Sequence, residues 1–434
     1  MRNLRDVVED PRIFARVMLR HQVWSRQDEI LHSVAKHART AVKACHASGK
    51  TFTAAEVVLW WITVHPQAVA ITTAPTWTQI ENVMWSEIRN SVSGAHVKYP
   101  QPTATELRLG PGRYAIGLST NEGVRFQGFH GSVLIVLDEA PGVLPEIWEA
   151  IEGIRAGGDV RVLALGNPTI ASGPFYDAFT SNREGWNLIT ISAFDTPNLV
   201  GLTQEQLLEL SEEELDHNPC PYLTTRRWVK EKCREWGPGH ALWESRVLGN
   251  FPSADPYGLI PLSWIETAKI REPLPSADEI EAGVDVAEGG ENETVACVRR
   301  GGHVIAAQGW SVRDARGPVA EFLRRYGARN VKVDKAGVGA YFEKHFRDLG
   351  YQVWGLNVGE APRNRERFDN LKAELYWGLR KRFETGQISG AFSERMVSQL
   401  AAIRYELSPR GQIEIESKEK MARRGVKSQS RSPD

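Results

Sequence analysis

The chain has few cysteines, no long apolar run and almost no net charge. Its four cysteines lie far apart, at positions 45, 220, 233 and 297 of 434 residues, which argues for a reducing compartment without structural disulfides. The longest apolar stretch, residues 57–64, is too short to cross a bilayer, and the N-terminus has no apolar run of signal-peptide length. The sequence therefore predicts a cytosolic protein that does not contact a membrane.

The net charge of −1 gives no sign of a polyanionic partner when the whole chain is considered. The charge is unevenly distributed, because residues 361–434 carry 16 Lys or Arg against 10 Asp or Glu. A segment of this kind can lie on nucleic acid while the chain as a whole stays near neutral. The length is sufficient for two or three domains.

One loose group of zinc-ligand residue types lies in the middle of the chain. It consists of His217, Cys220, Cys233 and His240. The spacing is irregular and fits no zinc-finger pattern, so a structural role without metal is the favoured interpretation.

A phosphate-binding loop is predicted where a strand that ends at residue 43 is followed by an apolar helix over residues 52–62. In such a loop the backbone N–H groups wrap a β-phosphate at the helix N-terminus. Lys50 would reach the β- and γ-phosphate oxygens, and Thr51 would hold Mg²⁺ through its hydroxyl. The alternative is a chance Gly-Lys-Thr in an ordinary loop. The loop comprises Ala44, Cys45, His46, Ala47, Ser48, Gly49, Lys50 and Thr51.

Polar residues follow the strands predicted after this loop. Asp138 and Glu139 follow the buried strand 133–137, and Asn167 follows the strand 160–165. Asp138 would hold the Mg²⁺ shell, Glu139 would polarise the attacking water, and the turn at Asn167 suits a γ-phosphate sensor, although Asn-Pro is also a common turn. Strands alternate with helices here, which predicts the α/β class.

Gln27 lies a short way before the loop, close to Trp24. An aromatic ring and a glutamine at this distance are well placed to meet an adenine. The alternative, that Trp24 belongs simply to the core, is equally acceptable.

The second half of the chain predicts three antiparallel strands, then a helix, a strand, a helix and a strand. This is the order of a ribonuclease H-like sheet, in which the first and fourth strands are neighbours, so Asp285 and Asp334 should lie side by side. Two buried acids are costly unless cations neutralise them, and a pair of Mg²⁺ or Mn²⁺ ions about 4 Å apart would also clamp a phosphodiester. The alternative is that these acids are solvated strand caps. Candidates for a third ligand are Glu291, Asp369, Glu374 and Asp434.

Taken in order, these motifs resemble the large terminase subunit of tailed bacteriophages, the motor-nuclease that packages DNA. The resemblance runs nearly from end to end, and the order of the motifs is more specific than any one of them. The motifs are residues 44–51, Gly128-Phe129-His130-Gly131, residues 133–140, Gly166-Asn167-Pro168, Gly249-Asn250-Phe251-Pro252, Gly283-Val284-Asp285 with Gly289-Gly290, Val333-Asp334 and Ser432-Pro433-Asp434.

The resemblance implies a P-loop ATPase domain of the ASCE type over residues 1–200 and a helical lid or linker over residues 201–252. It implies a ribonuclease H-like nuclease domain over residues 253–434. The activity expected is ATP-driven translocation of double-stranded DNA into a procapsid, plus two-metal cutting of concatemeric DNA. ATP and Mg²⁺ are the expected cofactors, with Mn²⁺ as an alternative at the nuclease site. Asp285, Asp334 and Asp434 would be the nuclease ligands.

The resemblance also implies partners. These are double-stranded DNA, the portal protein ring and the small terminase subunit. The chain is expected to be a monomer in solution and a homo-oligomeric ring on the procapsid, in the cytoplasm of an infected bacterial host.

The sequence departs from the family pattern at two places. His46 occupies the position four residues before the loop lysine, where many members carry an arginine, so Arg125 is a candidate finger in trans, the alternative being a surface arginine. The chain also stops at Asp434, where the family usually continues into a short helix. We therefore expect either a C-terminal truncation or a natural fragment with a poorly held third ligand, which puts the nuclease activity in more doubt than the ATPase activity.

Two further interpretations stay open at this point. One is a DNA-binding, helicase-like ATPase with a structural, non-cleaving C-terminal domain. Helicases usually pair two similar sheets, and the second half lacks the arginine-bearing motifs that they need, which favours the packaging motor. The other is a decayed prophage copy without activity, against which the intact motifs argue.

Overall fold

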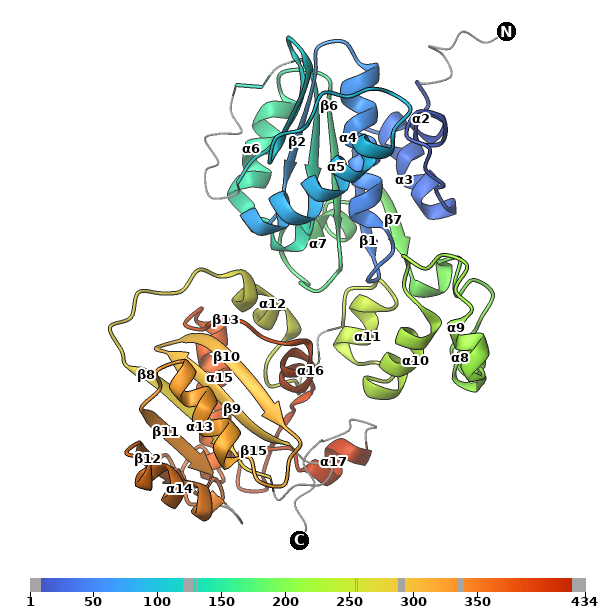
Figure 1. Ribbon diagram of the computed structural model, residues 1–434. Helices are drawn as coiled ribbons and strands as arrows, with labels where there is room; N and C mark the ends of the chain where they lie inside the picture. Colours follow the sequence, from blue (N-terminus) through green and yellow to red (C-terminus); the bar gives the residue numbers. More distant parts are fainter. Residues whose placement is uncertain are drawn as a thin grey trace. The chain divides into compact units, whose positions relative to one another are not determined.

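The computed structural model describes residues 9–119, 128–129, 131–253, 255, 257–287, 293–334 and 339–423 (Figure 1). The chain divides into two compact units, one of residues 1–234 with 238–252 and the other of residues 235–237 with 253–434. Residues 201–252 fall almost wholly in the first unit. The division into ATPase domain, helical lid and nuclease domain stays a prediction. No helix in the described ranges is long and apolar enough to span a membrane.

The first unit is built on a seven-stranded sheet with the order β3-β4-β2-β5-β6-β1-β7. Neighbouring strands are parallel except for β3 and β4, which form a hairpin. The strands are β1 (Arg39–Ala44), β2 (Ala68–Thr73), β3 (Glu106–Gly110), β4 (Arg113–Gly117), β5 (Ser132–Leu137), β6 (Val160–Gly166) and β7 (Asn187–Ile191). The strand before the loop, β1, and the strand before the paired acids, β5, are therefore separated by β6.

Helices pack against this sheet and account for its continuous apolar strands. Every residue of β2 is buried, and so are residues 133–137 of β5, because parallel strands in the centre of such a sheet are covered on both faces. The helical elements are α2 (Pro11–Val17), α3 (Ser25–Lys36), α4 (Lys50–Val64), the π-helix η1 (Gln79–Met84), α5 (Trp85–Gly94), η3 (Ala140–Gly142), α6 (Pro145–Arg155), α7 (Gly173–Phe179) and η4 (Ala193–Asp195). The predicted α/β fold of an ASCE-type P-loop sheet is confirmed.

Short helices follow β7 within the same unit (Figure 1). They are α8 (Gln204–Glu209), α9 (Glu212–Asp216), α10 (Arg226–Glu235) and α11 (Ala241–Arg246). Of the four zinc-ligand residue types, His240 caps α11, where its Nδ1 atom accepts a hydrogen bond from the Leu242 N–H at 3.1 Å, which fits the favoured structural role. In addition, the described part of the chain holds no group of three or more His, Cys, Asp or Glu side chains that could bind a metal ion.

The second unit contains a six-stranded sheet with the order β12-β11-β8-β9-β10-β13. Strand β9 is antiparallel to both of its neighbours, β8 and β10, whereas β11 runs parallel to both β8 and β12. The strands are β8 (Ile280–Asp285), β9 (Thr294–Arg300), β10 (His303–Trp310), β11 (Asn330–Asp334), β12 (Gln352–Leu356) and β13 (Ser389–Gly390). This is the predicted ribonuclease H-like order, with the first and fourth strands as neighbours.

Helices and one small hairpin complete the second unit. They are α12 (Leu262–Ile270), α13 (Arg316–Arg325), α14 (Gly339–Asp348), α15 (Leu371–Glu384), α16 (Glu394–Ala402), α17 (Lys418–Arg423), β14 (Tyr405–Leu407) and β15 (Ile413–Ile415). The core of this sheet is apolar and includes Phe322 and Leu323 of α13, Val331 and Val333 of β11, and Phe346 of α14. Alternate residues of β11 are buried, as expected for a strand that faces a helical layer.

Candidate nucleotide and nuclease sites

The predicted phosphate-binding loop joins β1 to α4 and has the backbone of an anion-binding turn. Gly49 is the residue before α4 and has φ +79°, and Ala47 has φ +48°. A Cβ atom on Gly49 would lie 2.4 Å from the Gln27 Nε2 atom, the far end of a side chain that can move aside, so glycine is favoured here mainly by its positive φ. The α4 N-terminus that follows offers unpaired N–H groups and the positive end of the helix dipole to an anion.

Lys50 and Thr51 lie where the loop motif requires them. The buried Lys50 ammonium donates to the Cys45 carbonyl oxygen at 3.1 Å, so it bends back over the loop. The Thr51 hydroxyl donates to the Asp138 Oδ2 atom at 3.0 Å. The carboxyl ends of parallel strands meet at one edge of a sheet, which is why residues 87 positions apart touch here.

Asp138 is a buried acid with 2% of its surface exposed. Burial, and after it the charge of Glu139, raise the pKa of its carboxyl to about 7, although the Lys50 ammonium and the Thr51 hydroxyl oppose the rise. A buried carboxylate whose pKa is raised in this way is stabilised in its charged form by a nearby cation. Together with the Thr51 hydroxyl it offers two hard oxygen ligands, which suits Mg²⁺.

Glu139 has a left-handed backbone with φ +47°, which is unusual for a residue other than glycine. Its N–H donates to the Asp138 Oδ1 atom at 3.1 Å, so the turn is bonded to the neighbouring acid. Strained backbone of this kind persists where the surrounding structure fixes it, which is common at functional sites. The carboxylate predicted to polarise water thus follows Asp138 directly at the sheet edge and is itself only partly exposed.

Asn167 lies at the end of β6 and touches the phosphate-binding loop. Its buried side-chain amide donates to the Ala44 carbonyl oxygen at 2.6 Å. The predicted sensor residue is therefore bonded to the strand end from which the loop starts. The role of Asn167 in reporting hydrolysis stays a prediction.

Gln27 of α3 is hydrogen-bonded to the phosphate-binding loop. Its Oε1 atom accepts from the Trp24 N–H at 3.2 Å, and its Nε2 donates to the Gly49 carbonyl oxygen at 3.4 Å. Cys45, also in the loop, is fully buried, and burial raises the pKa of its thiol to about 12. A thiol of this kind is protonated and chemically inert at neutral pH.

The loop has neighbours that the motifs alone did not predict. The His46 N–H donates to the Arg246 carbonyl oxygen at 2.9 Å, and the Thr224 N–H donates to the Ala47 carbonyl oxygen at 2.9 Å. A Cβ atom on Gly249 would lie 2.3 Å from the Ile191 carbonyl oxygen and 3.3 Å from the Cys45 nitrogen. The segment of residues 220–250 therefore packs directly on the loop. The Gly-Asn-Phe-Pro motif at 249–252 was the signal that could have indicated this contact.

Asp285 and Asp334 end the neighbouring parallel strands β8 and β11. Val284 pairs with Val333 in the register of these strands, so the two acids follow at adjacent strand ends, as predicted. The expectation that both are buried is wrong, because Asp285 is exposed and Asp334 is partly exposed. Tyr376 of α15 lies near this edge; burial raises the pKa of its phenol, and the charge of Asp285 raises it further.

Two of the candidate third ligands already have structural partners. Glu374 accepts a hydrogen bond from the Arg363 N–H at 2.6 Å, and the exposed Asp369 accepts from the Asn370 side-chain amide at 3.2 Å. The other predicted ligands, Glu291 and Asp434, lie outside the described residues, as does the candidate finger Arg125. Asp285 and Asp334 thus supply two oxygen ligands that suit a divalent cation, and the third ligand stays a prediction.

Comparison with known proteins was made both by sequence and by structure. No family model matches the chain. The probable large terminase subunit of Enterobacteria phage P7 is 23% identical over 436 residues, covering 92% of this chain and 84% of that protein. The large terminase of the thermophilic bacteriophage D6E is 12% identical with a TM-score of 0.43, covering 93% of this chain and 98% of that one. The nuclease domain of the large terminase subunit of bacterial virus Sf6 is 17% identical with a TM-score of 0.35, covering 38% of this chain and 90% of that domain.

The sequence match to the phage P7 protein extends over nearly all of this chain and most of that relative. It therefore includes both sheets and the motifs at their edges. The resemblance predicted from the order of the motifs is confirmed: this chain is similar, along nearly its whole length, to a large terminase subunit of a bacteriophage.

Proposed function

We propose that this chain is the ATP-driven motor and nuclease of a phage DNA-packaging machine. It translocates double-stranded DNA into a procapsid through a portal ring and cuts the concatemer in its second unit. The observation that carries the proposal is the contact between Thr51 and Asp138, across β6, beside a loop that holds Lys50. The similarity to the probable large terminase subunit of phage P7, which covers 92% of this chain, supports it.

In the first unit, each residue at the sheet edge has a distinct task. Lys50 binds the β- and γ-phosphate oxygens, and Thr51 and Asp138 hold Mg²⁺, which offsets the charge of the transferred phosphoryl group. Glu139 orients and polarises the attacking water. Asn167, bonded to the Ala44 carbonyl, transmits the nucleotide state to the strand end.

In the second unit, Asp285 and Asp334 hold divalent cations, Mg²⁺ or Mn²⁺, with Asp434 as the third ligand. Such ions stabilise the attacking and leaving oxygens of a phosphodiester. The protein contributes the fixed spacing of two adjacent parallel strand ends. The exposure of Asp285 leaves this edge open to a bulky substrate such as a DNA duplex.

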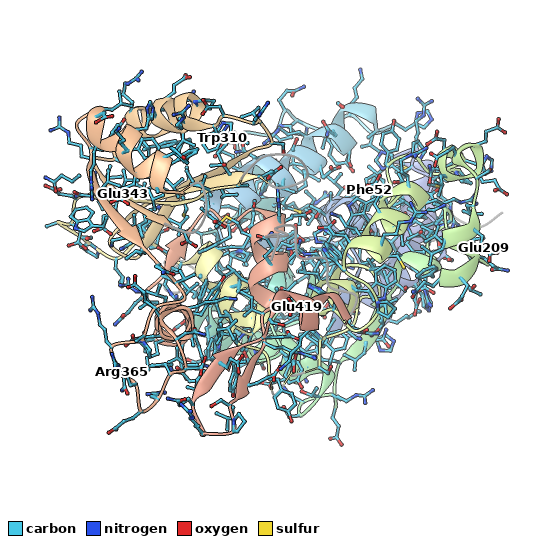
Figure 2. All side chains as sticks on the ribbon, turned by 90° about the horizontal axis from the view of Figure 1, so that it is seen from below. Phe52, Glu209, Trp310, Glu343, Arg365 and Glu419 are labelled. Carbon is cyan, nitrogen blue, oxygen red and sulfur yellow. The ribbon has the colours of Figure 1, made fainter. Side chains whose placement is uncertain are left out.

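A basic segment of the second unit fits the backbone of DNA. Arg363 and Arg365 are exposed between β12 and α15, and Arg365 lies at the outer edge of this unit (Figure 2). Contacts of this kind go mostly to phosphates, so DNA binding should weaken steeply as salt is raised.

The proposal includes the partners implied by the resemblance. These are the portal ring, the small terminase subunit and, on the procapsid, further copies of this chain in a ring. Arg125 acts in trans on the ATP of a neighbouring copy, which compensates for His46 in the loop. The setting is the cytoplasm of an infected bacterial host, with the free chain as a monomer.

The helicase-like alternative has less support from the fold. Helicases pair two similar sheets around the nucleotide, whereas the second sheet here has a different strand order and mixes parallel with antiparallel pairs. We therefore favour the motor with a nuclease domain.

Two assays on the full chain test the proposal. Plasmid nicking with Mn²⁺ should be lost in Asp285→Ala, and ATP turnover should be lost in Lys50→Ala, each with the other activity retained. Equal cleavage by the unmutated chain and Asp285→Ala would exclude the nuclease site. Equal ATP turnover by the unmutated chain and Lys50→Ala would exclude the loop as the ATPase site.

A further inference from the structure

The segment between α9 and α10 lies against the rim of the phosphate-binding loop. The Thr224 N–H donates to the Ala47 carbonyl oxygen at 2.9 Å. The buried Leu223 side chain approaches to 3.5 Å of the position that a Cβ atom on Gly49 would occupy. The Gln27 Nε2 atom lies 2.4 Å from the same position. Two separate parts of the chain, one on each side of the loop in sequence, therefore meet over Gly49.

This segment is held in one conformation by a buried asparagine. The Asn198 side chain is fully buried and donates to the carbonyl oxygens of Cys220, at 2.8 Å, and Thr224, at 3.0 Å. The Asn198 Oδ1 atom accepts in return from the Cys220 N–H at 2.8 Å. Backbone groups tied to a buried amide on both sides of a turn are fixed in place, so the residues between them have a defined direction.

Tyr222 is the side chain that this fixed turn holds in solvent. It is 94% exposed, which is the largest value among the exposed large hydrophobic side chains of the described residues. Its neighbour Leu223 is only 8% exposed and packs on the loop. One side chain of the turn is therefore buried against the loop, and the other lies in solvent. A rigid aromatic ring kept in water beside a phosphate-binding loop gains hydrophobic contact only when a ligand covers it.

We infer that Tyr222 stacks on the adenine of the nucleotide that binds at this loop. The inference rests on the proposed ATPase function and adds a specificity-determining residue to it. Such stacking requires that, when the β-phosphate lies in the loop at Lys50, the base extends past the loop on the side of Gly49 that Leu223 and Gln27 border. Stacking on a tyrosine face is open to any flat base, so the ring supplies affinity. Gln27 keeps one amide N–H and one carbonyl lone pair beyond its two hydrogen bonds, and these suit the edge of adenine.

Calorimetric titration of the full chain tests this stacking with two ligands. ATPγS with Mg²⁺ carries the base, whereas inorganic tripolyphosphate with Mg²⁺ carries only the phosphates. Tyr222→Ala should weaken ATPγS binding by about tenfold, which is within the range measured for base–aromatic stacking, and should leave tripolyphosphate binding within about twofold. Tyr222→Phe should retain the affinity of the unmutated chain for both ligands, because it keeps the ring.

Tyr341→Ala is the matched control, since Tyr341 is also highly exposed, at 70%, but belongs to the second unit. It should change neither affinity. Unchanged ATPγS binding by Tyr222→Ala would overturn the inference, because the ring would then serve another chain or nucleic acid. Equal weakening of both ligands would overturn it too, since Tyr222 would then shape the loop. Failure of the unmutated chain to bind ATPγS would instead exclude the proposed ATPase site itself.

Discussion

The edge of the first sheet and the edge of the second sheet both carry acids at the ends of parallel strands, but in different surroundings. Asp138 is buried, bonded to Thr51 and close to Lys50, and burial raises its pKa. Asp285 and Asp334 lie at neighbouring strand ends with much of Asp285 in water. The acid at the first edge is thus already bonded to a neighbouring side chain of the same site, whereas the second edge offers two acids and needs a third ligand to bind a metal ion. A buried, prebonded acid suits a compact nucleotide, and an open pair suits a long duplex.

The largest effect is expected at the first edge, from removing the carboxylate that we propose polarises the attacking water. Glu139→Gln should lower the steady-state rate of ATP turnover by about 10²–10⁴-fold, the usual contribution of a general base, while ATP still binds. DNA cleavage by the second unit should not change. Glu149→Gln on α6 is the control, because that acid is exposed. If Glu139→Gln kept the full rate of ATP turnover, Glu139 would not be a catalytic residue, and the two edges could not be distinguished as separate catalytic sites on this ground.

The second edge should respond in the opposite way. Asp334→Asn should lower Mn²⁺-dependent plasmid nicking by at least about 10²-fold, since it removes one charged ligand from a metal site, and ATP turnover should be retained. The control Asp348→Asn changes an exposed acid of α14 in the same unit and should cleave normally. Normal nicking by Asp334→Asn would show that the strand-end acids of this sheet are solvated caps.

The effect of the close contact between Gly49 and Gln27 can be measured as a change in the free energy of unfolding. Gly49→Ala should lower the free energy of unfolding by about 1–2 kcal/mol, mainly because alanine is strained at this positive φ, with a smaller cost for moving the Gln27 amide aside. Gly201→Ala is a matched control with φ +86° and no atom within 4 Å, so it should cost only the backbone term of about 1 kcal/mol. Urea denaturation of both variants gives the difference. Equal losses would mean that the Gln27 contact adds no steric cost.

The last expected effect concerns pH. The folded-state pKa of Asp138 lies above its ordinary value of 3.8, at about 7, so the folded chain binds this proton more tightly than the unfolded chain. Stability from this group is therefore greatest below pH 3.8 and is lost as the pH rises toward 7. Asp138→Asn should flatten the decline in melting temperature between pH 5 and pH 7, a window that lies within this range. If the melting temperatures of the unmutated chain and of Asp138→Asn declined equally, other groups would cause the pH dependence.

Much of both sites was predictable from short stretches of sequence. The loop, the acids after β5 and the asparagine after β6 were predicted from apolar runs followed by polar residues, because such runs indicate buried strands whose ends share one edge. The adjacency of Asp285 and Asp334 followed from strand order. How far the two acids are exposed could not be predicted in this way, since exposure at a strand end depends on what packs over it. The contact of residues 220–250 with the loop was also missed, because the short helices there carry no motif for the surface that they cover.

The sequence by itself determined the elements, their order and the side chains at the strand ends, because local periodicity and turn residues act over short distances along the chain. Only the tertiary structure decided that β6 separates β1 from β5, that Thr51 bonds to Asp138, and that Asn198 fixes the turn bearing Tyr222. These contacts join residues far apart in sequence, and they form only when the packing of the whole unit brings the elements together. The environment of each acid follows from that packing, and so does the raised pKa of Asp138.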